Sequence, residues 1–304
     1  MTDHDEQPDA LTIDVRAVTK RFGDTAALNG LDLTVTKGQI HGFLGPNGSG
    51  KTTTLRILLG LLSRDSGVTR VFGRDPWAHS VSIHRRLSYV PGDVALWPTL
   101  SGGESIDYLT RLRGGADRAR ILQLIERFDL NPRVKVSSYS KGNRQKVVLI
   151  SALAADVPLY IFDEPTDGLD PLMAEVFREE VKALRTRERT VLLSSHVLAE
   201  VDAVCDHVTI IRDGRTIETG ALSQLRHLQR QSLMIETRDE LGDIAQIPGV
   251  YDVERNARTV HCTVEPAALS DVLMQATAAH VVNLETRPPS LEEMFLRYYD
   301  RDAS

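Results

Sequence analysis

The sequence predicts an α/β fold with a largely parallel central sheet, followed by a smaller α+β domain. Up to about residue 220, short runs rich in Val, Ile and Leu alternate with helix-like patterns. A glycine-rich stretch, GPNGSGKTT, lies between one of these apolar runs and a helical pattern. Beyond about residue 220 the pattern changes to short strands and amphipathic stretches, which indicates a second domain.

The predicted strands of the first domain are short apolar runs, several of which alternate with helical patterns. They cover residues 12–18, 31–35, 39–44, 159–162, 190–194 and 208–212. Parallel strands need long crossover connections, usually helices, so this alternation favours a largely parallel sheet.

The second domain is expected to follow the order β-α-β-β-α-β, the split-βαβ pattern. Its strands are the runs LMIETR, VYDVER, TVHCTV and VVNLETR, with a short helix after the first and a longer one at 266–280. A polar helical stretch at 221–231 precedes them, and an amphipathic helix at 290–299 follows. The expected organisation is a disordered lead-in at 1–10, a first domain at 11–220 and a second domain at 221–304.

Composition limits the classes of partner. The formal net charge is -6, and Lys and Arg form no run long enough to neutralise many phosphates, so no nucleic acid is expected. Cys205 and Cys262 lack a neighbouring Cys or His at metal-ligand spacing, which argues against a disulfide framework or a zinc site. The longest apolar stretch, 147–162, is interrupted by Asp156 and Pro158 and is too short to cross a bilayer. Any membrane span is therefore expected on another chain.

The stretch GFLGPNGSGKTTTL fits a Walker A phosphate-binding loop, because it joins an apolar strand to a helical pattern. Glycines let backbone N–H groups turn toward phosphate, Lys51 supplies charge for the β and γ oxygens, and the Thr52 hydroxyl is a Mg²⁺ ligand. The alternative is a glycine-rich turn that caps a helix and binds nothing. The predicted ATP-binding residues here are Gly45, Pro46, Asn47, Gly48, Ser49, Gly50, Lys51, Thr52 and Thr53.

The stretch LYIFDEPTDGLD fits a Walker B motif, in which an apolar strand ends in carboxylates. Asp163 is predicted to be the second Mg²⁺ ligand, and Glu164 to orient and deprotonate the attacking water. Two solvated surface carboxylates are the alternative, which the phosphate loop upstream disfavours.

Together, GPNGSGKTT, IFDEPTDGLDP and the later LLSSH resemble the ATPase subunit of ABC transporters over roughly residues 10 to 220. The resemblance implies a P-loop NTPase core of the ABC type with a helical subdomain. It also implies that His196 is a catalytic switch histidine beside Lys51 and Glu164, and that Asp170 lies in the loop that crosses to a partner ATPase. VTKRFGDTAALNGLDLTV resembles the family's N-terminal strands, in which an aromatic residue, here Phe22, stacks on adenine.

Two stretches compete for the family's LSGGQ signature. LSGGE, within TLSGGES at 99–105, is close in spelling but lies too far upstream of Walker B. SYSKGNRQK lies one short helix upstream, so the resemblance makes Ser140 and Gly142 the residues that reach a partner's ATP from a helix N-terminus. Lys141 and Asn143 depart from the common spelling. Residues Val148, Leu149, Ala152 and Leu153 are expected to form one apolar face of the following helix.

LSGGE has a simpler interpretation as a helix start. Ser101 followed three residues later by Glu104 is a capping box, and Ile106, Leu109 and Leu112 are expected to form the apolar stripe of the helix that it opens.

A second departure from the family pattern lies in RRLSYVPGDVALWPTL. The family places a Gln or Glu here that reaches magnesium and senses the transport partner, whereas this chain has Gly92. Glycine offers no metal ligand, so either Asp93 substitutes or water completes the shell. A simple tight turn is the more economical interpretation of PGD.

One chain carries one phosphate loop and one signature, so the resemblance implies a homodimer that encloses two ATP with Mg²⁺. The partner would be a separate transmembrane permease, with this chain cytoplasmic and peripheral on the inner face of the cell membrane. KGNRQK, SLEEMFLRYY and the small second domain resemble the bacterial drug-exporter branch of the daunorubicin-resistance type. Export of a hydrophobic or antibiotic-like compound is the expectation. An importer ATPase is the nearer alternative, and a soluble ABC ATPase acting on nucleic acid or ribosomes the more distant one.

Overall fold

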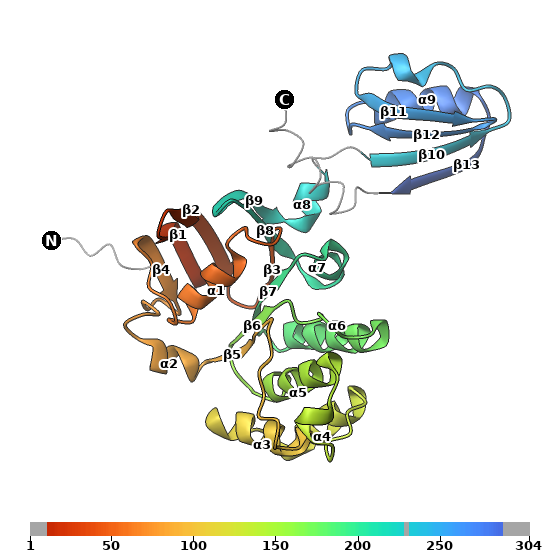
Figure 1. The fold of residues 1–304 in the computed structure, drawn as a ribbon. Coiled ribbons are helices and arrows are strands. Elements are labelled where there is room, and N and C mark those ends of the chain that lie inside the picture. Colours follow the sequence, from red (N-terminus) through yellow and green to blue (C-terminus); the bar gives the residue numbers. More distant parts are fainter. Residues whose placement is uncertain (1–10, 228–230, 288–304) are drawn as a thin grey trace. The chain divides into compact units, whose positions relative to one another are not determined.

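The computed structural model describes residues 11–227 and 231–287, which form two compact units divided between Thr219 and Gly220 (Figure 1). The expected lead-in at 1–10 and the expected helix at 290–299 lie outside the described residues.

The first unit is built around a six-stranded sheet with the order β5-β6-β7-β3-β8-β9. Its strands are β3 (Ile40–Leu44), β5 (Leu87–Val90), β6 (Leu159–Asp163), β7 (Thr190–Ser195), β8 (His207–Arg212) and β9 (Arg215–Ala221). The pairs β5-β6, β6-β7, β7-β3 and β3-β8 are parallel. The predicted α/β class with a largely parallel sheet is therefore confirmed.

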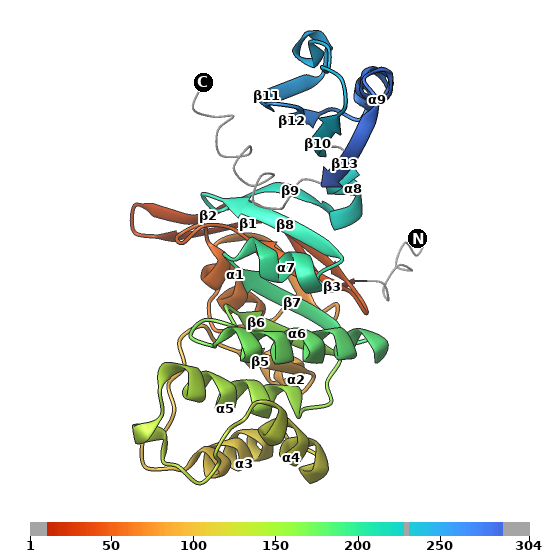
Figure 2. The same cartoon turned by 90° about the vertical axis from the view of Figure 1, so that its right-hand side faces the viewer.

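Helix α1 (Lys51–Leu58) covers one face of this sheet, and α6 (Pro171–Thr186) and α7 (Leu198–Val204) cover the other (Figures 1 and 2). Because both faces are covered, β3, β6 and β7 are buried along their whole length. The carboxyl ends of β3, β6 and β7 bring together the loops that follow them in the sequence.

The first two predicted strands do not join the parallel sheet. They are β1 (Leu11–Phe22) and β2 (Thr25–Thr36), which pair with each other and with β4 (Ser66–Val71) in an antiparallel sheet of order β2-β1-β4. Only two residues separate β1 from β2, which is enough for a hairpin and too few for a parallel crossover.

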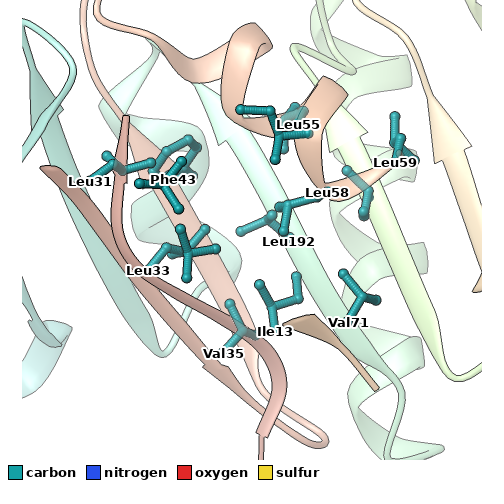
Figure 3. Close-up of a cluster of buried hydrophobic side chains, with 14 of the residues drawn as sticks. Ile13, Leu31, Leu33, Val35, Phe43, Leu55, Leu58, Leu59, Val71 and Leu192 are labelled. Carbon is teal, nitrogen blue, oxygen red and sulfur yellow. The ribbon is translucent and has the colours of Figure 1, made fainter. Parts of the chain in front are cut away.

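One hydrophobic core lies between the two sheets and α1. Side chains from β1 and β2 meet Phe43 of β3, Leu192 of β7 and Leu55 and Leu58 of α1, all of them almost fully buried (Figure 3). Helix α2 (Ser80–His84) adds Ile83 to this core.

A helical subdomain is inserted between β5 and β6. It contains α3 (Gly102–Leu112), α4 (Arg118–Arg127), the short 3₁₀ turn η1 (Val136–Ser138) and α5 (Lys141–Leu153). Helix α5 is buried at every position from Gln145 to Leu153, so the expectation of a single apolar face was too narrow. Arg120 and Arg127 of α4 both pair with the buried carboxylate of Glu180 on α6, which ties the subdomain to the parallel-sheet core.

The second unit contains α8 (Leu222–His227) and a four-stranded antiparallel sheet of order β11-β12-β10-β13. Its strands are β10 (Gln231–Thr237), β11 (Val250–Asn256), β12 (Thr259–Val264) and β13 (Val281–Arg287), with α9 (Leu269–Ala278) before the last strand. This order is that of the predicted split-βαβ pattern. The first predicted helix is reduced to the 3₁₀ turn η2 (Ile244–Gln246), which Pro248 follows too closely for a longer helix.

Candidate active site

The phosphate loop lies between the end of β3 and the start of α1. Lys51 is 6% exposed, and its Nζ donates hydrogen bonds to Gly45 O at 2.6 Å and Pro46 O at 3.2 Å, which closes the loop on itself. A Cβ on Gly45 would lie 2.5 Å from Ser49 Oγ and 2.6 Å from Ile211 O, so the loop can be this tight only with glycine there. The first turn of α1 carries no acidic residue, which leaves its positive end free for an anion.

Asp163 and Thr52, the two predicted Mg²⁺ ligands, lie together beside this loop. Asp163, the last residue of β6, is 3% exposed. Its Oδ1 accepts a hydrogen bond from Ser194 Oγ at 2.5 Å, and its Oδ2 accepts one from Thr52 Oγ1 at 3.4 Å. Burial is the main cause that raises the pKa of Asp163, and the hydrogen bond from Ser194 opposes it.

This donor set fits Mg²⁺. One carboxylate and one hydroxyl are hard oxygen ligands, and Mg²⁺ is usually bound by one or two carboxylates together with substrate phosphates. Within residues 11–227 and 231–287 no group of three or more His, Cys, Asp or Glu side chains could hold a metal by itself. The geometry therefore suits a metal that arrives with a phosphate ligand.

Glu164 brings a second carboxylate to the same point. Its backbone has a φ of 48°, an uncommon conformation for a residue with a side chain, and its N–H donates to Ser194 O at 3.1 Å. Its Oε1 lies 3.5 Å from Lys51 Nζ. Its Oε2 accepts hydrogen bonds from His196 Nδ1 at 2.7 Å and from His196 N at 3.3 Å. The predicted catalytic residues Lys51, Glu164 and His196 thus lie together.

The predicted signature residues lie at the start of α5. Ser140 caps this helix, and its Oγ accepts a hydrogen bond from Asn143 N at 3.2 Å. A Cβ on Gly142 would lie 2.4 Å from Gly168 O, so the helix start packs closely on the loop that follows β6. Lys141 Nζ pairs with Asp167 Oδ2 of that loop at 2.6 Å. In both Figure 1 and Figure 2, α5 lies apart from α1, the helix that begins with Lys51 and Thr52.

Comparison with known proteins gives this arrangement a family. Residues 28–167 match the ABC transporter family model, and residues 220–299 match the C-terminal domain of DrrA1-3-like ATP-binding proteins. The chain is 36% identical over 302 residues to the daunorubicin resistance ATP-binding protein DrrA3 of Streptomyces coeruleorubidus, covering 94% of this chain and 95% of that protein. This chain belongs to the ATP-binding proteins of ABC transporters.

A second relative of this ABC ATPase is the Nod factor export ATP-binding protein I of Burkholderia lata, 34% identical over 304 residues, with 95% of this chain and 97% of that protein covered. Among solved structures, a bacterial Atm1-family ABC exporter with ATP bound is similar at a TM-score of 0.63 and 26% identity. That match covers 74% of this chain and 42% of the exporter chain. The predicted P-loop core of the ABC type is thereby confirmed.

LSGGE in this ABC ATPase is a helix start, as predicted. Ser101 caps α3 with a complete capping box, in which the Glu104 carboxylate accepts hydrogen bonds from Ser101 N and Ser101 Oγ. Ile106 is buried, but Leu112 is 66% exposed, so its expected place in the buried stripe was wrong. Leu112 lies in the last turn of α3 and lines a surface groove.

Phe22 and Asp170 have simple local surroundings. The Phe22 ring, at the end of β1, is 51% exposed, and Lys20 Nζ lies 5.7 Å from its centroid. Lys20 is held by Asp65 at 2.8 Å. Asp170 caps α6, with its Oδ1 accepting a hydrogen bond from Met173 N at 3.0 Å, and it is exposed. Stacking on adenine and contact with a partner remain predictions for these two residues.

Gly92 lies directly beside Asp163, one of the two predicted Mg²⁺ ligands. A Cβ at this position would be 3.3 Å from Asp163 O and 3.7 Å from Asp163 Oδ2. The side chain of Asp93 is exposed. The residue that corresponds to the family's Gln or Glu therefore lies beside Asp163, but as a glycine it has no side chain that could bind a metal.

Sequence reasoning missed three polar residues around this site: Ser194, Thr166 and Glu200. Ser194 contacts both acidic residues: its Oγ donates to the Asp163 carboxylate, and its backbone O accepts a hydrogen bond from Glu164 N. The LLSSH motif contains Ser194, but the family resemblance assigns a role only to its histidine.

A groove of about 760 Å³ lies between the core and the helical subdomain. Its lining combines residues after α1, on α2, on β5 and at the end of α3. Among them Leu61, Val81 and Leu112 are each more than 60% exposed.

Within residues 11–227 and 231–287, no helix combines the length and the apolar character that a membrane span requires.

Proposed function

We propose that this chain is the ATP-hydrolysing subunit of an ABC exporter that works with a separate transmembrane permease. The convergence of Lys51, Glu164 and His196 beside the Asp163–Thr52 pair carries the proposal. Asp163 and Thr52 would hold Mg²⁺, which would neutralise charge on the phosphate oxygens of bound ATP.

Each catalytic side chain has one task. Lys51 leaves the carbonyls of Gly45 and Pro46 to bind phosphate oxygens. Glu164 accepts the proton of the attacking water, and the His196 Nδ1–H hydrogen bond fixes the carboxylate in place. When both ring nitrogens carry a proton, Nδ1 donates to Glu164 and Nε2 can donate to a γ-phosphate oxygen. His196 is 52% exposed, which leaves room for that contact.

The active form is a homodimer in which Ser140 and Gly142 complete the partner's ATP site. Two facts support this: α5 lies apart from α1 within one chain, and its N-terminal turn is exposed at Ser140 and Lys141. A helix N-terminus offers free N–H groups to phosphate. The loop ending at Asp170 would pass between the two subunits, and the exposed face of Phe22 would stack on adenine.

The permease is expected to dock at the groove between the core and the helical subdomain. Exposed apolar side chains rarely gather on a soluble surface without a partner, and Leu61, Val81 and Leu112 gather there. Docking at this groove would place the chain on the inner face of the cell membrane. The loop at Gly92 follows β5, which also lines the groove, so movement of the groove can reach Asp163.

The export direction is supported by relatives whose names refer to daunorubicin resistance and Nod factor export. We infer a hydrophobic or antibiotic-like cargo. The importer alternative predicts a neighbouring gene for a binding protein, and the soluble alternative predicts recovery with ribosomes or nucleic acid.

The test is co-expression with the membrane protein encoded beside this chain. The complex should be recovered from membranes, and candidate cargo compounds should stimulate its ATP hydrolysis in the intact complex but not in the Glu164→Gln complex. Ser140→Arg should abolish hydrolysis, and Ser101→Ala should leave it largely intact. A chain that hydrolyses ATP at full rate as a monomer, and is indifferent to Glu164→Gln, would refute the proposal.

A further inference from the structure

Glu200, on the first turn of α7, joins two loops that carry the catalytic side chains. Its Oε1 accepts a hydrogen bond from the hydroxyl of Thr166, two residues after Glu164. Its Oε2 accepts one from Ser195 Oγ at 3.1 Å, one residue before His196. The carboxylate therefore links the loop after β6 to the end of β7, immediately before His196.

Ser195 extends this link to the other side of His196. Its Oγ accepts a hydrogen bond from Val197 N at 2.9 Å while it donates to Glu200. The two residues that flank His196 are thus fixed by one hydroxyl, whose orientation the carboxylate sets. Because Glu200 accepts both hydroxyl protons, each hydroxyl keeps its lone pairs for other donors.

The link matters because His196 and Glu164 must keep their relative position. They meet through His196 Nδ1 and Glu164 Oε2 at 2.7 Å, and His196 is otherwise half exposed. Glu164 has an uncommon backbone conformation that neighbouring contacts must maintain. An acidic side chain in the first turn stabilises any helix through the helix dipole. That general effect alone would not explain why the Glu200 carboxylate bonds to Thr166 and Ser195.

We propose that Glu200 is a positioning residue for ATP hydrolysis, which holds the His196 loop against the Glu164 loop. The inference rests on the proposed function, because it assumes that Glu164 and His196 act on ATP. Glu200 touches neither nucleotide nor water in this role, and it acts through Thr166 and Ser195.

The test compares Glu200→Ala with Glu200→Gln in the full chain. A displacement of catalytic groups by about 1 Å can cost about 100-fold in rate, so Glu200→Ala should lower kcat by about 10- to 100-fold. The KM for ATP and the melting temperature should stay close to those of the unchanged chain, because the phosphate loop is untouched. Glu200→Gln keeps the size and one acceptor oxygen, and its amide can donate to the second hydroxyl, so it should restore kcat to within about threefold.

Glu175→Ala is the matched control. Glu175 is also an acidic residue near the start of a helix, but it is exposed and bonds only to Arg178 of the same helix among the contacts described for it. It should leave kcat unchanged. Thr166→Val and Ser195→Ala should each lower kcat, and neither should lower it further in the Glu200→Ala chain.

Each outcome decides the matter. A kcat loss restored by Gln supports the inference, whereas unchanged hydrolysis in Glu200→Ala, or an equal loss of ATP affinity and melting temperature, overturns it. If Glu200→Ala does not fold, the Thr166→Val/Ser195→Ala chain gives the same comparison with Glu200 retained. Glu164→Gln separates the two proposals: if Glu164→Gln abolishes hydrolysis while Glu200→Ala does not affect it, only the Glu200 inference fails.

Discussion

Gly142→Ala and Gly103→Ala form a matched pair that decides which glycine-rich stretch works as the signature. Both glycines are the second residue of a helix capped by a serine, Ser140 before α5 and Ser101 before α3. A Cβ on Gly142 would lie 2.4 Å from Gly168 O, whereas a Cβ on Gly103 would lie 3.2 Å from Pro132 O. For a Cβ at position 142 to lie 3.2 Å from Gly168 O instead of 2.4 Å, the start of α5 must move away from Gly168 by about 0.8 Å.

The consequences for stability and activity differ. Ala in place of Gly favours a helix by about 0.5 to 1 kcal/mol, which should offset the tighter contact at Gly103. Overpacking costs about 1 to 3 kcal/mol, so Gly142→Ala should lower the free energy of unfolding by about 1 kcal/mol after the same gain. A shift approaching 1 Å in the residues predicted to reach the partner's ATP should reduce kcat by about 100-fold.

The assay is steady-state ATP hydrolysis with purified chains, accompanied by urea unfolding followed by circular dichroism. Gly103→Ala should retain hydrolysis within about twofold because α3 makes no catalytic contact in this scheme. Loss of hydrolysis in Gly103→Ala with normal activity in Gly142→Ala would show that LSGGE, and not YSKGN, contacts ATP.

Three further predictions concern carboxylates at or near the predicted Mg²⁺ site. Glu164→Gln should lower hydrolysis by about 10²- to 10⁴-fold while ATP binding, measured by calorimetry, is retained. Asp93→Ala should leave the Mg²⁺ concentration for half-maximal hydrolysis unchanged, because its side chain is exposed; a clear rise would make it a ligand. Burial raises the pKa of Asp163, so the ionised carboxylate opposes folding increasingly as the pH rises from the ordinary pKa through the raised one. Nucleotide-free Asp163→Asn should therefore melt at an equal or higher temperature at neutral pH, with the difference shrinking in acid, and should lose stabilisation by Mg²⁺-ATP.

The phosphate loop could be predicted because its geometry is local. Gly45, Lys51 and Thr52 lie within eight consecutive residues, so the sequence itself carries their spacing. Asp163 and Glu164 were found for a similar reason, since both stand at the end of a buried strand. The family resemblance then identified His196, whose contact with Glu164 spans 32 residues of sequence.

Residues that act across the fold could not be found in this way. Ser194 and Glu200 are defined by partners on other strands and loops, and Ser or Glu at such positions has many ordinary uses. The strands β4 and β5 were also missed. Four of the six residues in β4 are exposed, so the strand lacks a strong apolar pattern, and β5 has only four residues. β1 and β2 pair because only two residues connect them, and the spacing of apolar residues in the sequence does not reveal so short a connection.

At Gly92, the sequence pattern and the distances in the structure concern the same side-chain position. The sequence indicates that a ligand is missing, and the structure shows that the position is still 3.7 Å from Asp163 Oδ2 when a Cβ is placed on it. A Gln there could extend toward the metal that Asp163 and Thr52 are proposed to hold, although its Cβ must fit 3.3 Å from Asp163 O. Gly92→Gln should therefore lower the Mg²⁺ concentration for half-maximal hydrolysis by about two- to tenfold, since one added oxygen ligand replaces water. Gly92→Leu, of similar size without an oxygen, is the control, and an equal effect of both variants would show that packing of the loop, and not ligation, is what changed.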